Sequence, residues 1–303
     1  FIFDKKKMEY YIVDVFTNEK YGGNQLGVFI DFDQRASSET MLTIAKELGF
    51  AEISFITKKH DNPSFDVRIF TPEYEVPFAG HPTLGTSYII SKHLVSAPTN
   101  TLHINLKHAS IKVELSNTED LSNSYFTMEQ AAPEFIDAFT AEEMASALDI
   151  PLEWMDPSLP VEEITTGLPY IIIPLRSLHA INNLVLDDKK LLDFLTQNKK
   201  YKSNSKSGLS TSLFFITAET IHANNGYHSR MFCIENEKIT EDAATGSANG
   251  CFLAYLLKHK NKHIQTTVEQ GFALQRKSYI QLEGELNDNT YKIKVGGQVV
   301  EVS

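Results

Sequence analysis

Hydrophobic and polar residues alternate over many short segments of the chain, a pattern that predicts β-strands. The first group of expected strands covers residues 10–16, 26–32, 50–57, 67–70, 101–106, 110–115 and 124–128. The second group covers a segment near residue 164 and residues 170–175, 211–217, 229–235, 268–271, 278–283 and 291–295. Gly296 and Gly297 predict a two-residue hairpin turn into a last strand at 298–302.

Apolar residues at helical spacing are rarer. They occur at residues 41–48, after serines that could cap a helix and before Gly49, a natural helix end. Thr140 and Glu143 have the spacing of a capping box at the start of a short helix. Another helix is expected around residues 191–195.

Two segments share a different pattern, in which small residues lead directly into an apolar helical run. One begins at Gly80 and the other near Gly246. Small residues let the backbone approach a ligand closely, and the first turn of a helix has unpartnered N–H groups and partial positive charge. Each start could hold a carboxylate, although an ordinary tightly packed helix start would look the same. The repetition indicates a duplicated unit, with both helix starts facing one cleft.

Many strands and one longer helix late in each half predict an α+β protein built twice. A chain of 303 residues is long for a single core and natural for two domains. We expect an N-terminal half at residues 8–128, which the C-terminal strand could complete, and a C-terminal half at residues 129–303. Met8 has the position of a natural start, so residues 1–7 are expected not to belong to the natural chain.

Charge and composition exclude several classes of function. The net charge is −11 and the basic residues form no broad patch, so nucleic-acid binding is not expected. No apolar segment approaches the ~20 residues needed to span a bilayer, and no secretory signal is visible. Cys233 and Cys251 allow no disulfide framework and fit a reducing cytoplasm. Both lie in apolar segments and are expected to be buried, inert thiols.

Three residues are candidates for acid–base chemistry. Glu52 lies among apolar strand residues, where desolvation would raise its pKa toward general acid–base use; a strand carboxylate turned to water is the alternative. His81 follows Gly80 at a helix start, where the dipole favours a neutral imidazole that could bind substrate or relay a proton, or it could be structural. Asp242 could simply cap the second helix, or it could face His81 across the shared cleft.

Other motifs do not support a function. Gly80 and Gly85 have phosphate-loop spacing, but the lysine is absent, and there is no dinucleotide fingerprint and no serine nucleophile elbow. His259 and His263 are four residues apart, a spacing that could place a metal on a helix face. They lie among lysines that suit a helix C-terminus, so no metal site is expected.

Together the motifs resemble those of the PhzF-like family of phenazine-biosynthesis proteins, a branch of the diaminopimelate epimerase fold. The resemblance extends over nearly the whole chain. Its strongest blocks are Gly80-His81-Pro82-Thr83 and the acidic and small residues at 241–248. Supporting segments are residues 13–17, 23–24, 51–52, 70–72, 77–79 and 269–271.

The resemblance implies two similar α+β halves around a central cleft, each a strand barrel wrapped on one helix. It implies that Glu52 is the acid–base residue and that His81 and Asp242 are accompanying polar groups. The residues expected to bind the substrate are Asn24, Gly80, Pro82, Thr83, Gly246 and Ser247. The resemblance also implies no metal, no organic cofactor and a homodimer.

The chain differs from the family and its relatives in two ways. The related epimerases use one cysteine at each helix start, whereas Cys251 lies one to two turns into its helix, which disfavours a two-thiol racemase. Gln25 and Ala243 stand where the family commonly has proline, and these changes are expected to alter loop stiffness more than chemistry.

We therefore expect a cytoplasmic, cofactor-independent isomerase that moves a proton between carbons of a small carboxylate-bearing substrate. The alternatives are an epimerase or racemase on the same fold, and a non-catalytic binder of small molecules or proteins. The sequence specifies neither the physiological substrate and pathway nor the dimer interface.

Overall fold

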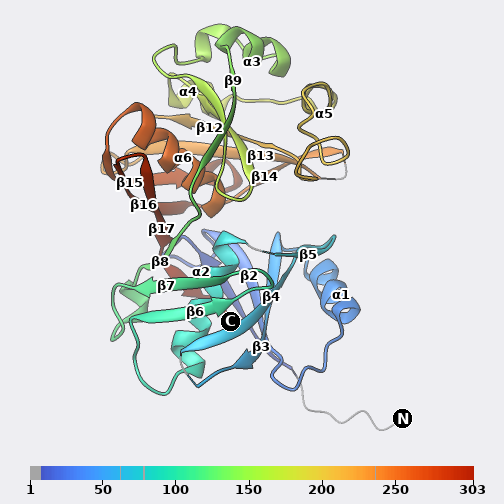
Figure 1. Ribbon diagram of the computed structural model, residues 1–303, viewed down its shortest axis with the longest axis vertical. Coiled ribbons are helices and arrows are strands. Elements are labelled where there is room, and N and C mark those ends of the chain that lie inside the picture. The colour runs from blue at the N-terminus through green and yellow to red at the C-terminus, as the bar shows by residue number, and fades with distance from the viewer. Residues whose placement is uncertain (1–7, 62, 78, 236) are drawn as a thin grey trace. The chain divides into compact units, whose positions relative to one another are not determined.

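The computed structural model describes residues 8–61, 63–77, 79–235 and 237–303. It contains two compact units, each with its own strands and its own buried helix (Figure 1). Unit 1 comprises the described residues up to Met128 together with Gly296–Ser303, and unit 2 comprises Glu129–Val295. The expectation about residues 1–7 concerns a segment outside the described residues.

Unit 1 is built from strands that pair in a continuous order. They are β1 (Glu9–Val15), β2 (Asn24–Ile30), β3 (Glu52–Lys59), β4 (Ser64–Phe70), β5 (Glu75–Val76), β6 (Thr101–Asn105), β7 (Ser110–Leu115), β8 (Phe126–Glu129) and β18 (Val299–Glu301). The order is β18-β1-β2-β3-β4-β6-β7-β8, with β5 also paired to β4. The pairs β2–β3 and β4–β6 are parallel, and the other pairs are antiparallel.

Helix α2 (Gly80–Ile89) forms the centre of unit 1. All ten of its residues are buried, and a π-helical turn, η1 (Ile90–Leu94), continues it. The helix contacts β1, β2, β3, β6, β7 and β18, so strands from both ends of the order touch it (Figure 1). The strands therefore wrap around α2. Helix α1 (Ser38–Leu48) begins and ends where its cap residues predict, after Ser37 and before Gly49, and the short 3₁₀ turn η2 is Leu121–Asn123.

Unit 2 has a second set of strands and four helices. The strands are β9 (Glu134–Phe139), β10 (Val161–Thr165), β11 (Pro169–Pro174), β12 (Ser212–Thr217), β13 (Tyr227–Glu235), β14 (Lys238–Asp242), β15 (His263–Gln270), β16 (Ser278–Asn287) and β17 (Thr290–Gly297). The helices are α3 (Ala141–Leu148), α4 (Leu178–Asn182), α5 (Asp188–Gln197) and α6 (Gly246–His259), and the 3₁₀ turns are η3 (Leu152–Trp154) and η4 (Phe272–Leu274). Helix α3 starts with the capping box that Thr140 and Glu143 predict.

The strand order of unit 2 repeats that of unit 1. It is β9-β10-β11-β12-β13-β15-β16-β17, with β14 also paired to β13. The parallel pairs, β11–β12 and β13–β15, occupy the positions of β2–β3 and β4–β6. Helices α2 and α6 follow the equivalent short strands β5 and β14. The duplication inferred from the two helix starts is therefore confirmed by the topology.

The expected hairpin at Gly296 and Gly297 is wrong. Both residues belong to β17, as its last two, and the last strand, β18, pairs with β1. Neither glycine has a positive φ. A Cβ atom added to Gly296 would lie 2.4 Å from Thr127 Oγ1, and one added to Gly297 would lie 2.5 Å from Phe16 Cδ1. Glycine is needed at both positions because neighbouring atoms approach the backbone closely, and not because the chain turns there.

Close packing of α2 on the strands of unit 1 predicts that Gly85→Ala destabilises the protein. A Cβ atom at Gly85 would meet Leu26 Cδ2 at 2.6 Å and Val15 Cγ2 at 2.8 Å, inside a core without room. We expect a loss of about 1–3 kcal/mol in the free energy of unfolding, measured in urea. Glu47→Ala, on the exposed face of α1, is the control and should change it by less than ~0.5 kcal/mol. Equal stability of the two variants would contradict the packing argument.

Candidate functional site

The two central helices begin without side-chain caps. Four other helices have one, from Ser37 (α1), Thr140 (α3), Ser177 (α4) and Asp187 (α5). No side chain caps α2 after Ala79, or α6 after Thr245, although threonine is a favoured capping residue. Neither N-cap side chain, that of Ala79 or that of Thr245, thus occupies a first-turn N–H group of its helix, which favours an anion site there.

Glu52 and His81 meet in unit 1. Glu52 is the first residue of β3, and His81 is the second residue of α2. Glu52 Oε2 lies 3.6 Å from His81 Nε2, slightly too far for a hydrogen bond. The His81 side chain is only 6% exposed, whereas that of Glu52 is 22% exposed. The carboxyl group can therefore be reached from solvent, and the imidazole lies behind it.

The ring of His81 is neutral. Burial lowers its pKa to about 3, against a weaker opposing effect of a hydrogen bond with the Gln25 backbone. Nε2 is buried and has no hydrogen-bond partner among the described residues, so Nδ1 makes the bond to Gln25. Because that bond favours the protonated ring, the Gln25 carbonyl accepts it and Nδ1 carries the proton. Nε2 then holds a lone pair directed toward the region of Glu52.

The other residues expected to bind substrate in unit 1 lie at the same helix start or beside it. Asn24 is a buried residue at the start of β2, paired with Val15. Pro82 has no N–H group to offer. The hydroxyl group of Thr83 donates to the Ala79 carbonyl at 2.8 Å, so that proton is not available to a ligand. Gly80 begins the helix.

Asp242 lies three residues before Thr245, the N-cap residue of α6. It is the last residue of β14, and the hydroxyl group of Thr245 donates to Asp242 Oδ2 at 2.5 Å. Residues from another part of the chain hold the segment between Asp242 and α6 in place. The hydroxyl group of Ser278 donates to the Ala243 carbonyl at 3.0 Å. Gly271, with a φ of +76°, also approaches that carbonyl so closely that a Cβ atom would lie 2.4 Å from it. Asp242 is therefore not the N-cap residue of α6, which is Thr245.

Tyr170 contacts the start of the second central helix, α6. Its hydroxyl group lies 2.6 Å from Ser247 Oγ, and both side chains are buried. Burial raises the pKa of Tyr170 well above its usual value, so the phenol stays protonated. Sequence reasoning missed Tyr170, because a tyrosine in an apolar strand has no local signal of such a contact.

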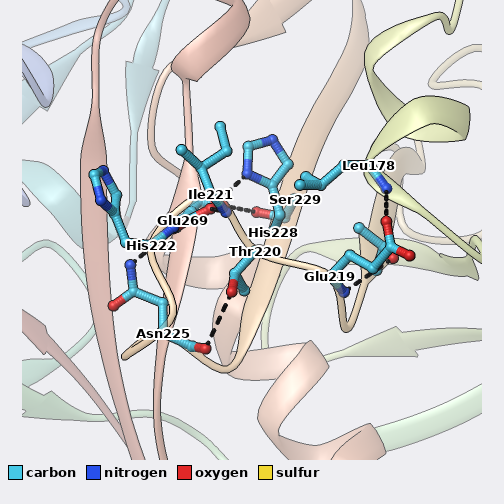
Figure 2. Close-up of polar contacts among 10 residues, drawn as sticks. Leu178, Glu219, Thr220, Ile221, His222, Asn225, His228, Ser229 and Glu269 are labelled. Atoms are coloured by element: carbon cyan, nitrogen blue, oxygen red, sulfur yellow. Dashed lines mark hydrogen bonds and ion pairs between the residues drawn. The ribbon is translucent and has the colours of Figure 1, made fainter.

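Two consecutive buried polar residues, Glu269 and Gln270, end β15, and Figure 2 shows the contacts of Glu269. The Glu269 carboxylate accepts from the N–H groups of Ile221 (2.9 Å) and His222 (2.8 Å). It also accepts from Asn225 Nδ2 (2.9 Å), and it lies 2.8 Å from His228 Nδ1. Burial alone would raise the pKa of Glu269, but these bonds hold it below its usual value. Gln270, the next residue, bonds to the segment around Asp242 and Thr245.

The two cysteines differ. Cys251 is buried in α6, and burial raises the pKa of its thiol to about 12, which confirms the expected inert thiol. Cys233 is only half-buried, so the expectation of burial is wrong there. Neither residue stands at a helix start.

No group of three or more His, Cys, Asp or Glu side chains able to hold a metal ion occurs in the described part of the chain. Helix α6 ends at His259 and His263 begins β15, so the two histidines do not share a helix face. His259 Nε2 instead lies 2.8 Å from Glu162 Oε2. Over the same described ranges, the helices are too short or too polar to cross a bilayer.

Comparisons with known proteins agree with this architecture. The profile of a family described as "Phenazine biosynthesis-like protein" matches residues 13–303. The chain is 28% identical to "Uncharacterized isomerase YfhB" of Bacillus subtilis, with 97% of each chain covered. It is 29% identical to "Trans-2,3-dihydro-3-hydroxyanthranilate isomerase" of Pseudomonas fluorescens, with 96% of each covered.

Solved structures show the same fold. A PhzF-family protein of Bacillus anthracis superposes with a TM-score of 0.82 at 26% identity, over 98% of each chain. A hydroxyproline epimerase from Agrobacterium vitis has a TM-score of 0.62 at 9% identity, over 100% of this chain and 92% of that one. The second likeness shows the fold alone. The expected α+β, diaminopimelate epimerase-like architecture is confirmed.

The low pKa of His81 makes stability depend on pH. An unfolded chain binds a proton at His81 below about pH 6.5, whereas the folded chain does not do so until about pH 3. Stability is therefore lost as the pH falls through this window. The parent should lose free energy of unfolding between pH 7 and pH 5, as measured in urea. In His81→Asn, which keeps a donor near the Gln25 carbonyl, this loss should be about 2 kcal/mol smaller. His108→Asn, which replaces an exposed histidine, is the control and should lose as much free energy of unfolding over this pH range as the parent. An identical pH dependence in His81→Asn and the parent would contradict the neutral buried ring.

Proposed function

Because the chain belongs to the phenazine biosynthesis-like protein family, as its motifs predicted, we propose that it is an isomerase that moves a proton between carbons of a small carboxylate-bearing substrate. The names of its relatives confirm the expected class of enzyme, since they include several isomerases. One observation carries the proposed chemistry. A half-buried carboxyl group, Glu52, stands beside Nε2 of a buried neutral imidazole, His81, and this nitrogen has no hydrogen-bond partner among the described residues.

Glu52 is the proposed base and acid. Its carboxylate takes a proton from an activated carbon, the double bond shifts, and the protonated carboxyl group returns the proton to another carbon on the same face. No electron leaves or enters the substrate in this sequence. His81 Nε2, a lone-pair acceptor behind Glu52, holds a hydrogen bond from the protonated carboxyl group or from a polar group of the substrate.

The helix starts are the proposed anion sites. The first-turn N–H groups of α2 and α6 would bind the substrate carboxylate and the negative charge that develops when the proton leaves. Gly80 and Gly246 allow the backbone to approach the ligand, and Ser247 adds a hydroxyl group that Tyr170 orients. Asp242 would accept hydrogen bonds from polar groups of the substrate. Supporting contacts are proposed for Asn24, Pro82 and Thr83.

Further features belong to the same proposal. Proton transfer by carboxyl and imidazole groups needs no metal or organic cofactor, so activity should survive dialysis against EDTA. Free cysteines suit a reducing cytoplasm as the site of action. A homodimer follows from the family resemblance, and light scattering would test it.

The epimerase or racemase alternative needs a base on each face of one carbon. A two-thiol form of it is disfavoured, because the thiol of Cys251 is buried with a raised pKa and lies inside α6. A non-catalytic binder would retain the anion sites but would not need an acid–base pair.

Incubation with trans-2,3-dihydro-3-hydroxyanthranilate in deuterated water tests the proposal. This compound is the first choice because the name of a relative includes it. NMR should show a migrated double bond and solvent deuterium at the protonated carbon. Glu52→Gln should lower kcat by about 10²–10⁴-fold, since it removes general acid–base catalysis. Glu39→Gln, on the exposed face of α1, should retain full activity.

Other outcomes decide against this reaction. Inversion at one carbon without double-bond migration would support an epimerase. Full activity in Glu52→Gln would exclude the proposed base. Binding without any proton exchange, over a panel of related carboxylates, would support the binder.

A further inference from the structure

Gln270 uses its whole hydrogen-bonding capacity on one short segment. Its side chain is fully buried. Oε1 accepts from the Thr245 N–H group and from Asn249 Nδ2, both at 3.1 Å. Nε2 donates to the Asp242 carbonyl at 3.1 Å and to Thr245 Oγ1 at 2.9 Å. A primary amide offers two donors and two acceptor sites, so nothing of Gln270 is left for another partner.

Backbone groups fix the orientation of this amide. The Thr245 N–H group can only donate, and the Asp242 carbonyl can only accept. The amide oxygen must therefore face Thr245 N, and the amide nitrogen must face Asp242 O. A flipped amide would place two donors together at one partner and two acceptors together at the other.

The orientation of Gln270 sets the direction of the next hydrogen bond. Because Nε2 donates to Thr245 Oγ1, the oxygen of that hydroxyl group is an acceptor in this contact. Its own proton is then free to point to Asp242 Oδ2, 2.5 Å away. The hydroxyl group consequently delivers a hydrogen bond to the carboxylate, while the N-terminus of α6 is left without the cap that Thr245 would otherwise supply.

We infer that Gln270 is a positioning residue, which through the hydroxyl group of Thr245 holds Asp242 as an ionised acceptor and keeps the α6 start open for an anion. The inference rests on the proposed role of Asp242 in binding the substrate. Glu269 supports it from the opposite face of β15, because its saturated carboxylate anchors the end of the strand (Figure 2).

Three variants separate the chain of contacts. Thr245→Val removes the hydroxyl group and keeps the shape, whereas Thr245→Ser keeps the hydroxyl group. Gln270→Glu keeps an acceptor for Thr245 N and Asn249 but replaces the donor Nε2 by an acceptor. The hydroxyl group of Thr245 would then turn toward residue 270 and away from Asp242. Melting curves check that each variant is folded.

The readout is the titration midpoint of the Asp242 carboxyl group, followed by ¹³C NMR in the free protein. Loss of one hydrogen bond to the carboxylate should raise this midpoint by about one pH unit in Thr245→Val, and Thr245→Ser should leave it unchanged. Charged or titratable groups near Asp242 include Glu241 with its partner Arg230, and Tyr170. These groups are the same in every variant.

A double-mutant cycle tests the route through Thr245. In the parent, Gln270→Glu adds a negative charge and also turns the hydroxyl group of Thr245 away from Asp242. In Thr245→Val only the added charge acts. Gln270→Glu should therefore raise the titration midpoint of Asp242 more in the parent than in Thr245→Val. Equal shifts in both backgrounds, or no shift in Thr245→Val, would overturn the inference. The titration needs no substrate, so its outcome is separate from that of the isomerase assay. If the isomerase is confirmed, the same variants should move the pH profile of kcat/KM in the same order.

Discussion

Complete burial of the two central helices is the constraint on which the rest of the structure depends. All of α2, and α6 from Gly246 to Leu257, lies out of solvent. A helix buried along its sides can meet a small polar ligand only at an end, where its N–H groups lack intrahelical partners. The strands that surround each helix therefore leave the helix start as the place where chemistry can happen. Small residues are needed within both helices, because a Cβ atom at Gly85 or at Gly250 would lie less than 3 Å from neighbouring side-chain atoms.

Buried polar atoms divide into two kinds around these starts. Those of Glu269 and Gln270 are saturated, and such groups rigidify the segments they hold. His81 Nε2 is buried and has no hydrogen-bond partner in the described part of the chain, which costs about 1–3 kcal/mol. A carboxyl group stands 3.6 Å away from it. Among the described residues, His228 Nε2 and Asn249 Oδ1 are also buried without a partner, so the nitrogen of His81 indicates a site only together with the carboxyl group beside it.

Local signals in the sequence predicted much of the fold. The boundaries of α1 and α3 follow from caps that act within one turn, and the alternation of side chains found most strands. Strand β5 was missed because it has only two residues, and β14 was missed because Ile239 is the one apolar residue among its five. The glycines of β17 were misinterpreted because the same residue serves turns and close approaches.

The site was predictable only in part. Glu52, His81 and Asp242 stand in recognisable motifs, but their partners come from distant strands. Gln270 is 28 residues from Asp242, and Tyr170 is 77 residues from Ser247, and nothing local marks either contact. The neutral state of His81 likewise depends on burial by the surrounding strands, so it follows from tertiary structure and not from its neighbours in the chain.

The duplicated helix starts have diverged in a way that favours a proton shift on one face. The second residue of α2 is His81, which lies beside a carboxyl group, whereas the second residue of α6 is Ser247, a hydroxyl group bonded to a phenol that stays protonated. The short strand before α2 ends at Val76, and its counterpart ends at Asp242. Inversion at carbon needs two bases of similar competence. Here one half of the duplication holds the proton-accepting pair, and the other holds a carboxylate fixed by Thr245. Such asymmetry suits an enzyme that removes and returns a proton through a single group.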